Sequence, residues 1–74
     1  CWSVYNTILL EKLTPIIVDV RCPNDFRVDY QTIANRLSSK TKVIIITHMF
    51  GVLVEDNIIK ELKDNFPSLI IIED

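Results

Sequence analysis

Three short blocks of apolar, β-branched residues recur along the chain at intervals of about 27 residues. They run from Pro15 to Val20, from Lys42 to Thr47 and from Leu69 to Glu73. The interval matches a strand followed by a crossover helix. Because the blocks are continuously apolar rather than alternating, both faces of each strand should be covered, as in a parallel sheet packed between helices. The pattern predicts three parallel strands.

Amphipathic stretches separate the three blocks. Asp29 is the expected N-cap of one helix, and Ser38 and Ser39 are expected to end it. Its apolar residues recur at the i, i+3, i+4 and i+7 spacing of a helix with one face on a sheet. They are Tyr30, Ile33, Ala34 and Leu37.

Two further stretches have the same helical pattern. The one from Glu55 to Phe66 begins with acidic residues, which the helix dipole favours, and Pro67 is expected to stop it. Its apolar residues are Ile58, Ile59, Leu62 and Phe66. Near the start of the chain, Ser3 is the expected cap of a helix. Its apolar side would carry Val4, Ile8, Leu9 and Leu13.

The predicted order is helix, strand, helix, strand, helix, strand, which indicates a three-layer α/β fold with right-handed crossover helices. Seventy-four residues make at most one domain, and a chain this short hides only about 60% of its unfolded surface. Yet 49% of its residues are hydrophobic and only one is glycine. With Cys1 as its first residue, we expect residues 1–74 to be an incomplete part of a larger domain.

Charge and cysteine content exclude several classes of function. Eight basic and ten acidic residues are spread along the chain, so no basic face for nucleic acid or membrane lipid is expected. No apolar run approaches the roughly 20 residues of a membrane helix, and no signal peptide opens the chain. Cys1 and Cys22 have no metal-ligand cluster around them. We expect a soluble cytoplasmic protein with reduced thiols and no metal site.

Candidate chemistry gathers where the predicted strands end. Parallel strands place Asp19, His48 and Asp74 at or beyond their carboxyl ends, the edge where open α/β sheets bind ligands. A carboxylate at the tip of a buried strand, such as Asp74, needs a partner. The favoured interpretations of Asp19 and His48 are hydrogen bonds to nearby backbone. Gly51 is expected in a turn that other residues rarely adopt.

Four segments together resemble a known family. "YNTILL", "TPIIVDV", "TKVIIITHMFG" and "LIIIED", at these separations, resemble the DegT/DnrJ/StrS family of sugar aminotransferases over nearly the whole chain. The family consists of pyridoxal-phosphate (PLP) enzymes with the aspartate-aminotransferase-like fold (fold type I). The resemblance implies a piece of the large, cofactor-binding domain. It also implies PLP as cofactor, a keto-sugar nucleotide and glutamate as substrates, and a homodimeric parent enzyme.

The resemblance also implies roles for individual residues. The family aspartate at the position of Asp74 pairs with the protonated pyridine nitrogen of PLP, so that the ring can act as an electron sink. A residue packed on the face of the ring would correspond to Cys1 or to Trp2. Alternatively, the Trp2 side chain would pack in the core or in a dimer interface. Independently of the resemblance, the position of His48 after a predicted strand makes it a candidate for general acid–base work.

The chain also departs from the family. Lys12 stands where the family usually has glycine, and the usual Gln-Pro does not follow "HMFG". None of its lysines stands at the position of the Schiff-base lysine, and the turn that binds the PLP phosphate would precede Cys1. We therefore expect no catalytic lysine in this chain and no activity from the chain alone.

Three other functions remain open. The chain could be a small non-enzymatic α/β interaction module, although three parallel strands would leave unpaired edges. A Rossmann-type nucleotide-binding domain needs a glycine-rich turn after its first strand, and "VRCPNDFR" has none. The parent could also be one of the family's PLP-dependent sugar dehydratases, in which histidine replaces the catalytic lysine.

Overall fold

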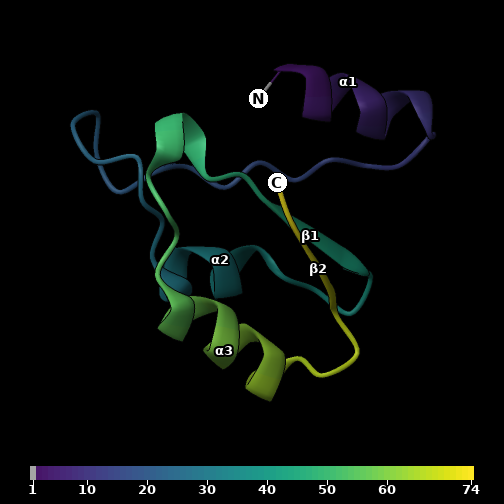
Figure 1. Cartoon of the computed structure of the whole chain (residues 1–74). Coiled ribbons are helices and arrows are strands. Elements are labelled where there is room, and N and C mark those ends of the chain that lie inside the picture. Colours follow the sequence, from purple (N-terminus) through teal and green to yellow (C-terminus); the bar gives the residue numbers. More distant parts are fainter. Residues whose placement is uncertain (1) are drawn as a thin grey trace.

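Two parallel strands and three helices make up the α/β fold of the computed structural model, which describes residues 2–74 (Figure 1). The elements, in chain order, are α1 (Trp2–Leu10), α2 (Tyr30–Arg36), β1 (Val43–Ile46), the 3₁₀ turn η1 (Met49–Gly51), α3 (Asp56–Asn65) and β2 (Ile70–Glu73). The second and third predicted strands and all three predicted helices are therefore confirmed, with boundaries within a few residues of the apolar patterns.

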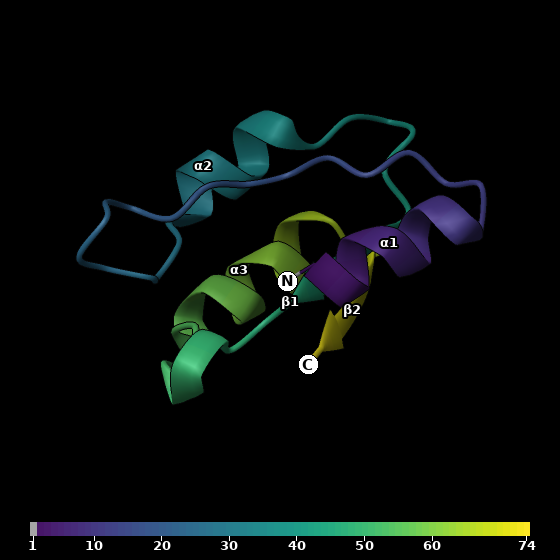
Figure 2. The same ribbon diagram turned by 90° about the horizontal axis from the view of Figure 1, so that it is seen from above.

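The sheet separates α1 from the other two helices (Figure 1). β1 and β2 pair in parallel, with Val43 opposite Ile70 and Ile46 opposite Glu73. Side chains of a strand alternate between the two faces. Ile44 and Ile71 pack toward the core formed with α2 and α3, whereas Ile45 and Ile72 lie on the face of α1. Figure 2 shows the same arrangement from above.

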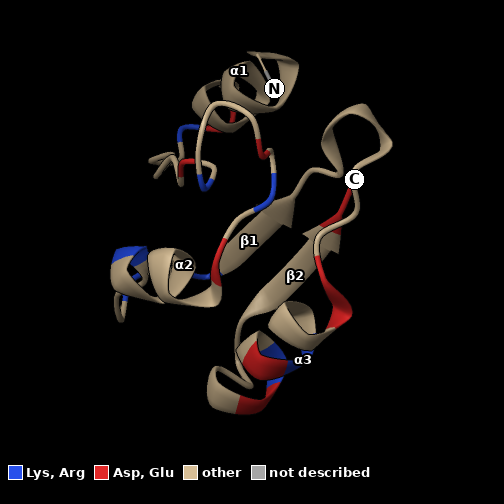
Figure 3. Ribbon diagram, turned by 90° about the vertical axis from the view of Figure 1, so that its left-hand side faces the viewer, with Lys and Arg blue, Asp and Glu red and all other residues tan. Residues whose placement is uncertain are grey.

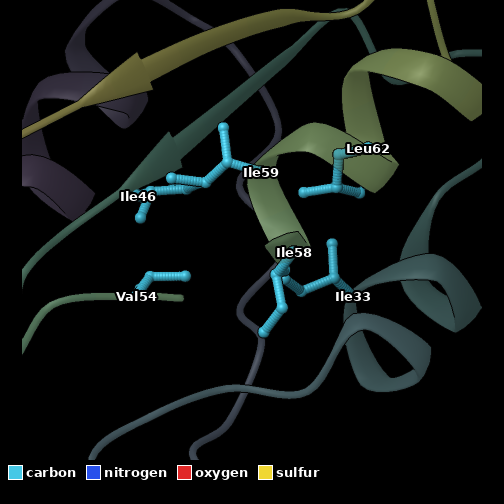
Figure 4. Packing of buried hydrophobic residues seen from close by; sticks show 6 residues of the cluster. All are labelled: Ile33, Ile46, Val54, Ile58, Ile59 and Leu62. Atoms are coloured by element: carbon cyan, nitrogen blue, oxygen red, sulfur yellow. The ribbon is translucent and has the colours of Figure 1, made fainter. Parts of the chain in front are cut away.

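The core lies between the sheet and the pair α2 and α3 (Figure 4). Its buried side chains are Ile33, Ile46, Val54, Ile58, Ile59 and Leu62. Ile58, Ile59 and Leu62 all come from α3, whose apolar residues recur at helical spacing. Leu62 has no exposed surface at all. The amphipathic pattern of α3 is therefore what brings this helix onto the sheet.

The prediction of a third strand at residues 15–20 is wrong for this structure. The segment is irregular, and Ile16 and Ile17 are 55% and 66% exposed. Its polar groups bind elsewhere, since the Arg36 guanidinium donates to the carbonyl oxygen of Ile17 and the Val20 N–H donates to the Asp19 carboxylate. A strand needs a neighbour that receives its ladder of hydrogen bonds. An apolar run supplies the hydrophobic faces of a strand but not that neighbour.

The start of α2 also differs from the prediction. Asp29 occupies the N-cap position, as expected, but its side chain makes no capping hydrogen bond. Its carboxylate pairs instead with the guanidinium of Arg21, which also contacts Glu55 at 3.2 Å. Arg27 binds Asp25 through two guanidinium nitrogens, at 2.8 and 3.0 Å. This network joins the loop of residues 21–27 to the starts of α2 and α3.

The network depends on ionised carboxylates. Hydrogen bonds from the Arg27 guanidinium lower the pKa of Asp25 from 3.8 to about 2. A carboxylate whose pKa is lowered by folding stabilises the fold above its unfolded pKa and loses that contribution as the pH falls. The Asp25 contact therefore contributes fully at neutral pH and weakens only between about pH 4 and pH 2.

The α1 helix is only loosely packed, and none of its residues is buried. Ser3, the expected cap, lies inside the helix, where its carbonyl oxygen accepts a hydrogen bond from the Thr7 hydroxyl at 2.8 Å. The helix ends in a Schellman motif, because the Lys12 N–H donates to Leu9 and the Leu13 N–H donates to Ile8. Lys12 has a φ of 59°. That left-handed conformation explains the glycine that the resemblance implies at this position.

Replacing Lys12 by glycine is expected to stabilise the protein. A side chain at φ 59° costs about 1 kcal/mol that glycine avoids, so the free energy of unfolding should rise by about 0.5–1 kcal/mol. Urea unfolding of the protein measures the change. Lys12→Ala is the matched control, because it removes the long side chain and keeps the Cβ. A Lys12→Gly variant no more stable than Lys12→Ala would contradict the prediction.

Candidate functional site

The carboxyl ends of β1 and β2 carry two of the residues singled out from the sequence. The His48 N–H donates to the carbonyl oxygen of Asp74 at 3.0 Å, and the Asp74 N–H donates to the carbonyl oxygen of Ile46 at 2.8 Å. The pairing of the strands thus continues past their ends and holds Asp74 beside His48. Figure 3 shows the acidic end of β2. Asp19, predicted at the same edge, is exposed and accepts a hydrogen bond from its own neighbour, Val20.

The imidazole of His48 is hydrogen-bonded on both sides. Its Nδ1 lies 3.1 Å from the backbone N–H of Val54, and its Nε2 lies 3.2 Å from Oε2 of Glu73. Because a backbone N–H can only donate, Nδ1 must be the acceptor and is unprotonated. In the neutral ring the proton is then on Nε2, which donates to the Glu73 carboxylate. His48 is 18% exposed, so the ring lies mostly out of solvent.

A tight loop brings Val54 back to the His48 ring. Phe50 and Gly51 both have positive φ, 54° and 76°, and the Val52 N–H donates to Met49 at 3.0 Å. These features define a type I′ turn, which requires positive φ at its two central residues. The expectation for Gly51 is confirmed. Phe50 adopts a conformation that is unfavourable for an aromatic residue, and its ring packs edge-on against Phe26 with centroids 5.4 Å apart.

A cavity of about 310 Å³ lies between α1 and the ends of the strands. Its lining residues are Ser3, Val4, Thr7, Ile45, Ile72, Glu73 and Asp74. Ser3 and Thr7 are four residues apart on α1, so they share one face of the helix. The cavity combines an apolar base formed by Ile45 and Ile72, the residues Ser3 and Thr7 on the side of α1, and the end of the sheet at Asp74.

The other residues predicted for the site lie apart from this cavity or are not described. Cys1 lies outside the described residues. Trp2 is 76% exposed, and its ring stacks on Tyr5 with centroids 6.0 Å apart. Neither Trp2 nor His48 lines the cavity.

Several residues of the site escaped the sequence analysis. Ser3 was considered only as a cap, although its spacing from Thr7 could have indicated a shared helix face. Glu73 was expected only as the end of an apolar block, with no contact predicted for its carboxylate. Val54 contributes a backbone group, which no residue pattern reveals.

A second, larger cavity of about 470 Å³ lies at the opposite end of the sheet. It is lined by the residues that follow α2 and α3, including Ser38, Thr41, Lys42 and Ser68. Lys42 precedes β1, so it lies at the amino end of the strand and away from Asp74. Of the helices in residues 2–74, none has both the length and the apolar character needed to cross a membrane.

Comparison with known proteins identifies the family. No curated protein and no solved structure gives a significant match to the chain. A family model for the DegT/DnrJ/EryC1/StrS aminotransferases matches residues 2–74, a range that contains both strands, all three helices and the cavity beside Asp74. The chain belongs to the DegT/DnrJ/EryC1/StrS aminotransferase family.

Proposed function

We propose that this chain is part of the PLP-binding large domain, of fold type I, in a homodimeric aminotransferase. The amino acceptor is a keto-sugar nucleotide and the donor is glutamate. The family is generally PLP-dependent. The single observation that supports the proposal most is the Asp74 carboxylate at a cavity with an apolar base.

The residues around the cavity fit PLP. The pyridine ring is flat and largely apolar, which suits the side chains of Ile45 and Ile72 on the sheet. Its nitrogen carries a proton and a positive charge that a carboxylate would stabilise. Asp74 would hold that proton on the pyridine nitrogen, and Ser3 and Thr7 would offer polar contacts on the side of α1.

PLP, when bound, supplies the electron sink for the transfer of the amino group. The residues of this chain would tune and orient it. Asp74 would keep the ring nitrogen protonated because an adjacent negative charge raises the pKa of a base. Ile45 and Ile72 would exclude water from one side of the ring, which strengthens that charge interaction.

The catalytic lysine would come from a residue outside these 74. Lys42, for example, lies at the wrong end of the sheet for a group that must act beside Asp74. The isolated chain is therefore expected to be inactive. The proposal must be tested with the complete protein.

The test is an assay of the complete protein with PLP, glutamate and a panel of keto-sugar nucleotides. We expect 2-oxoglutarate to form in an amount well above that of the enzyme and its cofactor only when PLP and a suitable sugar nucleotide are both present, because the sugar must accept the amino group before the next glutamate can react. PLP-dependent loss of water from the sugar without consumption of glutamate would identify a dehydratase and contradict the proposal. Failure to bind PLP at all would contradict it as well.

A further inference from the structure

Four hydrogen bonds meet at His48, at Glu73, which ends β2, and at Asp74, which follows it. The backbone N–H of His48 binds the Asp74 carbonyl, and the Asp74 N–H binds Ile46. The His48 ring binds the Glu73 carboxylate through Nε2 and the Val54 N–H through Nδ1. Neither the cofactor chemistry nor the packing of the core explains why the ring is held at both nitrogens.

We infer that His48 is a positioning residue that orients Asp74 through Glu73. The inference rests on the proposed function, because it concerns how the carboxylate that would bind PLP is held. His48 and Glu73 form what we call the His48–Glu73 clamp. The clamp would fix the end of β2 so that the Asp74 side chain is directed toward the cavity.

The inference follows from the alternation of side chains at the end of β2. Glu73 pairs with Ile46, a core residue, so its side chain emerges on the face of α2 and α3. Side chains alternate, so the next residue, Asp74, emerges on the face of α1, where the cavity lies. Holding the Glu73 side chain on its own face prevents the strand end from rotating. The same contact therefore keeps Asp74 on the opposite face.

Apart from the backbone hydrogen bonds that pair the ends of the strands, the contact with His48 is the side-chain hydrogen bond that holds this strand end. Glu73 and Asp74 are both exposed, so burial of their side chains contributes little. The ring of His48 is anchored by the Val54 N–H, and Val54 is itself a buried core residue. The clamp thus connects an exposed strand end to the core by way of one imidazole.

A direct catalytic role for His48 does not fit this arrangement. Both ring nitrogens are engaged, one by a backbone N–H and the other by a carboxylate. The residue does not line the cavity beside Asp74. An acid–base group must reach the proton that it transfers. His48 acts on the site through Glu73 instead.

The first test is the tautomer of His48 in the unmodified complete protein. Nitrogen-15 NMR distinguishes a protonated from an unprotonated ring nitrogen. The clamp requires a neutral ring with an unprotonated Nδ1 and the proton on Nε2. A neutral ring with its proton on Nδ1 would overturn the inference, whatever the activity of the enzyme.

The second test separates the two arms of the clamp. In His48→Gln the side-chain amide can reach Glu73, while the bond to Val54 is lost. In His48→Asn the side-chain oxygen can still accept from Val54, but Glu73 is out of reach. We expect His48→Asn to weaken PLP binding and turnover about ten- to a hundredfold, the range typical of losing a partner that orients a ligand residue. His48→Gln should retain more of both than His48→Asn, because it keeps the contact with Glu73 and loses only the anchoring bond to Val54.

The Glu73→Ala variant tests whether Glu73 and His48 act together. If the two residues act as one unit, Glu73→Ala should match His48→Asn, and the double variant should lose no more than either alone. A merely structural role would instead lower the unfolding temperature in His48→Asn and His48→Gln alike, with PLP affinity unchanged. That result would overturn the inference.

Asp74→Asn distinguishes failure of the inference from failure of the proposed function. If Asp74→Asn loses turnover and His48→Asn does not, the clamp is wrong and the PLP site stands. If neither variant affects PLP binding or turnover, both are wrong.

Discussion

The Leu62→Ala variant is expected to lose about 2–5 kcal/mol of unfolding free energy, the range measured when a large core side chain is reduced to alanine. Leu62 is the one fully buried side chain among residues 2–74. It lies on α3, between Ile33 of α2 and the sheet (Figure 4). Removing its methyl groups leaves a cavity that the packed neighbours fill only in part.

Leu53→Ala is the matched control for this prediction. It makes the same chemical change at a side chain that is 68% exposed, so the loss should be within about 0.5 kcal/mol. Urea unfolding of the complete protein, followed by circular dichroism, measures both variants. Equal losses for the two leucines would contradict the packing of α3 described above.

The Asp74→Asn variant is expected to reduce turnover by about a hundredfold or more, as happens when a preorganised group that stabilises charge is removed. Asparagine has nearly the shape of aspartate but no charge, so the fold should be preserved. The pyridine nitrogen would lose the negative charge that keeps it protonated. The rate with glutamate and the keto-sugar nucleotide measures the effect in the complete protein.

Asp19→Asn is the control for this substitution. Asp19 also follows an apolar run, but its carboxylate binds the neighbouring Val20 N–H and does not line the cavity. Its turnover should stay within about twofold of the unmodified protein, as is usual for an exposed residue outside a site. An Asp74→Asn enzyme that is as active as Asp19→Asn would remove Asp74 from the site.

Much of the fold could be predicted because the spacing of apolar residues along the sequence matches the residues that the fold buries. The helical spacing of Ile58, Ile59 and Leu62 matches the face that α3 buries. The apolar runs around Val43 and Ile70 match the paired strands. In these segments local pattern and tertiary packing agree.

The features that were predicted wrongly depend on contacts with distant segments, which a local sequence pattern does not contain. The run from Pro15 to Val20 has the composition of a strand, but pairing is a property of two segments. Asp29 occupies the expected cap position, yet its carboxylate forms an ion pair with the guanidinium of Arg21 and makes no capping hydrogen bond. The opening helix was expected to have one apolar side, yet no residue of α1 is buried.

The candidate site, too, could be predicted only in part. Parallel strands made it possible to predict that His48 and Asp74 lie at one edge, and their backbones are hydrogen-bonded. The expected backbone hydrogen bond of His48 is present, but its partner, Val54, could not be predicted, because the contact requires the type I′ turn at Phe50 and Gly51. Phenylalanine rarely adopts a positive φ, so a phenylalanine in the sequence does not indicate such a turn.

The protonation state of the PLP ring nitrogen tests the central claim most directly. The complete protein and its Asp74→Asn variant would each be loaded with PLP labelled with nitrogen-15 in the ring and compared by NMR at neutral pH. We expect a protonated nitrogen in the unmodified protein and an unprotonated one in Asp74→Asn. The same protonation state in both proteins would contradict the pairing of Asp74 with the cofactor.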